Sequence, residues 1–179
     1  MKESVDPQSL FLSEESIARH KEYVRNLRLK YSILQKSETL LKSTNIRDIK
    51  WQKMSSDLAS EAFFLLSEIT LHGLFFDSFS PITYQPLPSC VRSVYTTSAE
   101  LLNSIFRLAS EGVGGFIILY RDADKLMIAR VLPPYRELLY VRPLLAIDLF
   151  EHTYFSDYGF AVSDYLIAAL PHLDLSRLG

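Results

Sequence analysis

The sequence predicts a mixed α+β fold: an N-terminal antiparallel helical hairpin, a further helix, a three-stranded antiparallel sheet and C-terminal helices. Apolar residues recur at helical spacing through the first 80 residues, three short apolar runs fall between residues 115 and 147, and helical patterns then return. The chain has 179 residues, of which 48% are hydrophobic, so it can bury a sizeable core. We expect a helical unit at 1–81 and an α/β unit at 82–179.

Two helices account for the first unit. The hydroxyl and acidic side chains of Ser13-Glu-Glu-Ser16 favour a helix start, and the helix is expected to run over about 14–42. Ser43-Thr-Asn45 interrupts the pattern, and a second helix is expected at about 47–79, ending at Ser80-Pro81. Short connections between such helices favour an antiparallel hairpin.

The second unit begins with a proline-marked loop at 81–97, which includes Pro86 and Pro88. The remaining expected elements are a helix at 98–111, strands at 115–120, 126–131 and 138–147 arranged as a meander, and helices after 148 and at 163–170.

Composition argues against several classes of protein. The formal net charge of −2 does not favour bulk nucleic-acid binding, although basic residues concentrate between 19 and 53. The single cysteine, Cys90, excludes an internal disulfide and fits a reducing compartment. No apolar stretch approaches the ~20 residues of a membrane span, so no membrane partner is expected, and the N-terminus does not read as a signal peptide.

The strongest single motif lies at the end of the last apolar run. This run ends on Asp148, and His152 follows four residues later, beside Glu151. A carboxylate and an imidazole at this spacing converge if the chain turns into a helix, and such a pair suits a divalent transition metal. The alternative is that Asp148 only caps the helix.

Four stretches resemble motifs of the iron/manganese superoxide dismutase family, in the family's order. Asp148-Leu-Phe-Glu151-His152-Thr-Tyr-Phe155 is similar to the signature Asp-x-Trp-Glu-His-x-Tyr-Tyr. The other three resemble family helix and strand motifs: His20-Lys-Glu-Tyr23-Val in the first helix, His72-Gly-Leu-Phe-Phe in the second, and Gly112-Val-Gly114-Gly-Phe before the first strand. The resemblance covers about 12–170 and implies the family's fold.

The resemblance also implies a metal site for iron or manganese. Matched residue by residue, His72, Asp148 and His152 fall on three of the family's four ligands. The fourth, on the first helix, falls on Glu15 or His20. We favour Glu15, which stands at the family spacing from Tyr23, and then expect His20 to face a partner subunit.

The shell around this site departs from the family. The resemblance implies a cage of tryptophans around the metal, and Thr70, Gly115, Ile117 and Phe150 stand at those positions instead. Glu68 replaces a glutamine that tunes the metal-bound solvent, and Pro134 or a neighbour offers no amide at the alternative position in the sheet. The family's gateway tyrosine is retained as Tyr23, and so is Glu151, which pairs across the family's dimer interface. Because such outer groups set a metal's redox behaviour, we expect poor turnover or none, and no bound cofactor unless iron or manganese fills the site.

The resemblance extends to non-enzymatic relatives in the small subunit of the mitochondrial ribosome. Our leading hypothesis is therefore a structural, mitochondrial ribosomal protein that acts through a dismutase-like homodimer or heterodimer. Its partners would be other ribosomal proteins and rRNA. The alternative is a divergent iron- or manganese-dependent superoxide dismutase.

Overall fold

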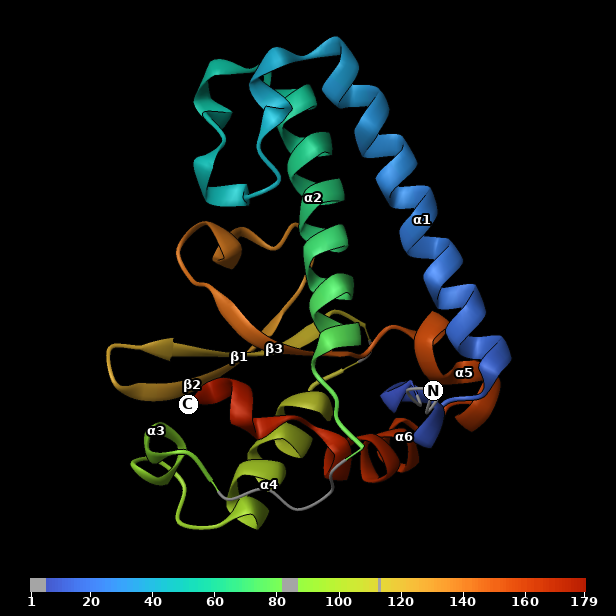
Figure 1. The fold of residues 1–179 in the computed structure, drawn as a ribbon, viewed down its shortest axis with the longest axis vertical. Coiled ribbons are helices and arrows are strands. Elements are labelled where there is room, and N and C mark those ends of the chain that lie inside the picture. Colours follow the sequence, from blue (N-terminus) through green and yellow to red (C-terminus); the bar gives the residue numbers. More distant parts are fainter. Residues whose placement is uncertain (1–5, 82–86, 113) are drawn as a thin grey trace, which may run out of the picture.

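The computed structural model describes residues 6–81, 87–112 and 114–179. Two long antiparallel helices, α1 (Glu14–Ser37) and α2 (Ser56–Asp77), stand over a small sheet (Figure 1). Ser13 begins α1, because its hydroxyl accepts the backbone N–H of Ser16 at 3.2 Å. Both helices are shorter than expected: α1 gives way to a 3₁₀ turn at Thr39–Lys42, and two further 3₁₀ turns precede α2.

The second half of the chain follows the expected order of elements. The helices are α3 (Ser89–Arg92), α4 (Ser98–Ala109), α5 (Glu151–Tyr158) and α6 (Val162–Ala169), and the strands are β1 (Phe116–Asp122), β2 (Lys125–Val131) and β3 (Pro143–Asp148). The α+β class is confirmed. The predicted loop at 81–97 contains α3, and its Pro86 lies outside the described residues.

The sheet corrects the predicted meander. The strands are antiparallel, but their order is β2-β1-β3, so β3 pairs with β1 rather than with β2. The central place of β1 matches its burial, because its first four residues, Phe116 to Leu119, are fully buried. Part of the stretch expected to be strand forms a 3₁₀ turn at Arg136–Leu139 instead.

One glycine controls the start of β1. Gly115 has φ +78°, and a Cβ there would lie 2.4 Å from the carbonyl oxygen of Val131. Its carbonyl accepts the N–H of Leu149, and the N–H of Gly114 is bonded to the carbonyl of the same leucine. These bonds hold the end of β3, and with it Asp148, against the start of β1.

The helix α2 corrects the expectation that no apolar stretch reaches membrane-spanning length. By length and composition alone it could cross a membrane, with a mean hydropathy of 1.3 over its most apolar window. Of that window, 44% is buried inside the protein, and core helices pass the same test. The buried residues of α2 include Leu71 and Phe75, which belong to the same hydrophobic core as the sheet.

Candidate metal centre

Four side chains from four elements meet where the hairpin reaches the sheet. They are His20 of α1, His72 of α2, Asp148 at the end of β3 and His152 in the first turn of α5. One donor atom from each lies within 4.8 Å of the other three. The first three residues are buried, whereas the His152 side chain is 34% exposed.

The carboxylate of Asp148 is the centre of this cluster. Its Oδ2 lies 3.3 Å from Nε2 of His20 and 3.4 Å from Nε2 of His72. The same oxygen lies 3.6 Å from Nε2 of His152. Donor atoms bound at about 2.1 Å to one ion, with bond angles of 90–120°, lie about 3.0–3.6 Å apart. The three distances from Asp148 therefore fit ligands of one metal ion.

The first turn of α5 fixes Asp148 in place. Its Oδ1 accepts the N–H of Phe150 at 2.8 Å, and its Oδ2 accepts the hydroxyl of Thr153 at 2.6 Å. Asp148 thus begins the helix and faces the histidines at the same time. Burial by itself would raise its pKa, but the nearby imidazoles of His152, His20 and His72 hold the pKa well below its ordinary value.

The two buried histidines are held differently. Nδ1 of His72 donates to the carbonyl of Glu68 at 2.8 Å, which leaves Nε2 without a proton and facing the cluster. Burial lowers the pKa of His72 to about 4, so the ring is neutral near pH 7. Neither ring nitrogen of His20 makes a hydrogen bond within the described residues. A buried imidazole without such a partner fits a metal ligand.

The structure therefore places His20, and not Glu15, with the other three donors. The Glu15 side chain is 75% exposed and pairs with Arg19 at 2.6 Å. Five residues along an α-helix correspond to a rotation of roughly 140° beyond a full turn, so the two positions cannot face the same point. The expected contact of His20 with a partner subunit is also wrong, because the residue is only 1% exposed.

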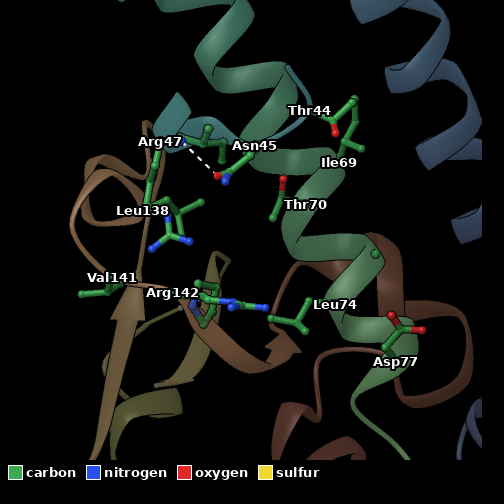
Figure 2. Close-up of a pocket in the computed structure, with 13 residues that line it drawn as sticks. Thr44, Asn45, Arg47, Ile69, Thr70, Leu74, Asp77, Leu138, Val141 and Arg142 are labelled. Atoms are coloured by element: carbon green, nitrogen blue, oxygen red, sulfur yellow. Dashed lines mark hydrogen bonds between the residues drawn. The ribbon is translucent and has the colours of Figure 1, made fainter. Parts of the chain in front are cut away.

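The neighbouring side chains differ from those expected. Phe150 stacks on His152 with ring centroids 5.5 Å apart, but Thr70 lines a cavity of about 550 Å³ on another face of α2, together with Arg47 and Arg142 (Figure 2). Sequence analysis missed Phe116, whose ring meets His72 edge-on at 5.0 Å. Its position directly after the glycines at the start of β1 was the available signal.

A smaller cavity leads from solvent to the cluster. Its volume is about 410 Å³, and it is lined by His20, His152, Tyr23 and Glu151, with Arg19 and Phe160 further out. Tyr23 is half-buried, and its ring centroid lies 4.7 Å from that of His152. A small ligand in this cavity can therefore contact His20 and His152 beside the tyrosine.

Comparison with known proteins agrees with this geometry. Residues 89–177 match the family model for the C-terminal domain of iron/manganese superoxide dismutases. This part of the chain is similar to the C-terminal domain of iron/manganese superoxide dismutases, and we call it the dismutase domain. The dismutase domain supplies Asp148 and His152, whereas His20 and His72 lie outside the matched residues. No curated protein matches the chain.

The dismutase domain suggests which metals the cluster suits. Three imidazole nitrogens and one carboxylate oxygen are a donor set for transition metals such as iron and manganese. With its unpartnered His20 and its spacing of 3.3–3.6 Å around Asp148, the cluster fits one such ion.

Proposed function

We propose that the protein binds one iron or manganese ion through His20, His72, Asp148 and His152, and that it acts as a superoxide dismutase. The convergence of four suitable donors beside a dismutase domain carries this proposal. A bound ion of either metal supplies one-electron exchange. One superoxide is oxidised to dioxygen, and a second, with two protons, is reduced to hydrogen peroxide.

The protein's contribution is to hold the donors before the metal arrives. Asp148 is fixed by two hydrogen bonds from α5, and the backbone bond of His72 selects the tautomer that presents Nε2. Phe116 and Phe150 cover the cluster with aromatic surface, and the mouth beside Tyr23 admits a small anion.

We also infer that two copies of the chain pair through the face around this mouth. Members of the family typically form dimers. On this face, Phe155 is 45% exposed and Phe160 is 83% exposed, with ring centroids 5.0 Å apart. Exposed aromatic rings beside the charged side chain of Glu151 are typical of an interface.

Elemental analysis and a superoxide assay on the same purified preparation test the proposal. We expect about one iron or manganese ion per chain. We also expect the preparation to remove superoxide, at a rate that does not rise when more metal is added. His72→Ala should lose both properties, because it removes a buried ligand, whereas Ser176→Ala, at an exposed position, should keep both. A wild-type chain that binds neither metal would overturn the proposal.

The scaffold role in a mitochondrial small ribosomal subunit stays a prediction, as does the mitochondrial location. The scaffold role is motivated by the residues around the donors that differ from those of the family, and by the basic residues of α1. Co-sedimentation of metal-free protein with small ribosomal subunits, unchanged in His72→Ala, would favour the scaffold over the enzyme.

A further inference from the structure

A buried carboxyl group joins three segments of the chain beside the metal centre. Glu68 of α2 is only 2% exposed. Its Oε2 accepts the hydroxyl of Tyr23, from α1, at 3.2 Å, and its Oε1 accepts the hydroxyl of Tyr135, from the connection between β2 and β3. Each carboxyl oxygen therefore has its own tyrosine partner.

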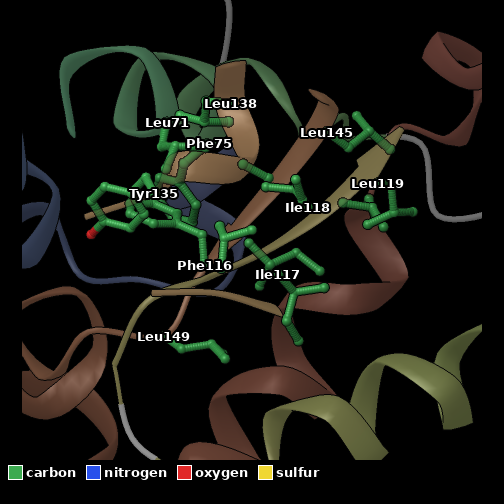
Figure 3. Packing of buried hydrophobic residues seen from close by; sticks show 14 of the residues in the cluster. Leu71, Phe75, Phe116, Ile117, Ile118, Leu119, Tyr135, Leu138, Leu145 and Leu149 are labelled. Atoms are coloured by element: carbon green, nitrogen blue, oxygen red, sulfur yellow. The ribbon is translucent and has the colours of Figure 1, made fainter. Parts of the chain in front are cut away.

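The backbone and the ring of Tyr135 are both held firmly. The residue has φ +58°, a left-handed conformation that is uncommon for a residue other than glycine. Its side chain is fully buried, and its ring lies 6.2 Å from that of Phe64 and 6.1 Å from that of Phe116 (Figure 3). Such conformations persist where the surrounding structure fixes them, and they concentrate at functional sites.

The Glu68 carboxyl group, which accepts the Tyr135 hydroxyl, also lies beside the metal centre. Oε2 of Glu68 lies 3.5 Å from Nδ1 of His72. The same oxygen binds Tyr23, whose ring stands in the mouth of the cavity beside His152. A rotation of the Glu68 side chain would therefore change both the surroundings of a ligand and the place of the Tyr23 hydroxyl.

We propose that Tyr135 is a positioning residue for the metal centre. Its hydroxyl fixes the rotamer of Glu68, which in turn places the Tyr23 hydroxyl at the mouth and a carboxyl oxygen beside His72. This role rests on the proposed function, and it assigns to that site a residue that the sequence motifs do not contain. Tyr135 acts through Glu68 and is not itself a ligand.

Tyr135→Phe tests the proposal, because it removes the hydroxyl and keeps the ring. We expect an unchanged metal content, a fall of about tenfold in turnover and an altered electron paramagnetic resonance spectrum of the bound metal, as removal of an outer partner of a metal site produces. Tyr31→Phe is the control, since its hydroxyl binds the carbonyl of Ser43, away from the site. Wild-type turnover and spectrum in Tyr135→Phe would overturn the proposal.

A double-mutant cycle separates this proposal from the proposed function. Tyr23 and Tyr135 share only Glu68 as a hydrogen-bond partner, so Tyr23→Phe and Tyr135→Phe should change the melting temperature of the metal-free chain non-additively. Tyr23→Phe with Tyr31→Phe should be additive. If wild type lacks metal or activity but the cycle is non-additive, the proposed function fails and the positioning of Glu68 stands. Additivity in the first pair overturns the positioning role whatever the activity.

Discussion

The N-terminal hairpin and the dismutase domain each supply half of the metal centre, but they supply it differently. Asp148 and His152 come from one short stretch: Asp148 ends β3, and His152 follows four residues later in the first turn of α5. His20 and His72 come from two helices, and they meet only because α1 packs along α2 (Figure 1). The spacing of the first pair is set by the local sequence, whereas the spacing of the second pair depends on the contact between two helices. The matched family model describes a C-terminal domain, so it covers the first pair of donors, and the second pair lies outside the matched residues.

The two halves also differ in what holds their donors without metal. Asp148 accepts hydrogen bonds from Phe150 and Thr153, so the fold itself uses its carboxylate. His20 makes no hydrogen bond within the described residues. We infer that Asp148 serves folding and metal binding, and that His20 serves metal binding alone.

Replacement of Asp148 should have the largest effect. Asp148→Ala leaves a buried N–H, a buried hydroxyl and the histidines without their acceptor, so we expect loss of the metal and a fall of about 3–5 kcal/mol in the free energy of unfolding of the metal-free chain. Urea unfolding and elemental analysis measure both. The exposed Asp122→Ala is the control, and a metal-free chain as stable as wild type would refute a folding role for Asp148.

Replacement of His20 should separate metal binding from folding. We expect His20→Gln to weaken metal affinity by at least about tenfold, because it removes an imidazole ligand. The glutamine keeps most of the buried volume beside Phe75 and Phe76, so the stability of the metal-free chain should change little. Competition with a chelator measures the affinity. The matched Glu15→Ala, on the exposed side of α1, should bind metal as wild type does. The opposite result for the two variants would restore Glu15 as the fourth ligand.

Replacement of Glu151 should affect pairing more than folding. The side chain is exposed at the mouth, so Glu151→Ala should yield more monomer that still unfolds cooperatively. Sedimentation velocity and thermal unfolding of the same sample show this. A dimer as tight as that of wild type would place the interface elsewhere.

The smallest effect concerns the junction of α5 with the start of α1. Oδ2 of Asp157 accepts the backbone N–H of Ser13 at 2.9 Å. Burial by itself would raise the pKa of Asp157, but hydrogen bonds from Ser13 lower that pKa below its ordinary value. The carboxylate therefore stabilises the fold at pH values above the ordinary pKa of an aspartate. This contribution is lost as the pH falls through the lowered pKa of Asp157. The stability difference between wild type and Asp157→Asn should shrink over this acid range; a constant difference would refute it.

Several features were predictable because they depend on local spacing. The α+β class followed from the order of helical and strand patterns, and the convergence of Asp148 with His152 followed from their four-residue spacing. The placement of His72 was implied only by the resemblance to the dismutase family. The division at residue 81 stays a prediction. Counting from Tyr23 did not identify the fourth ligand. Glu15 and His20 lie on different sides of α1, and only the packing of α1 against α2 shows which side meets the other donors. Tyr135 carried no signal, because its left-handed backbone depends on the packing around it.

The sequence by itself determined the fold class, the two donors of the dismutase domain and the loss of the family's aromatic and amide groups near them. These properties depend on residue type and on short spacings, and local backbone geometry fixes where closely spaced residues lie. Only the tertiary structure decided that His20 completes the donor set and that Glu68 lies between two tyrosines. Contacts between distant segments depend on how helices rotate and pack, and burial then decides which polar side chain faces the interior.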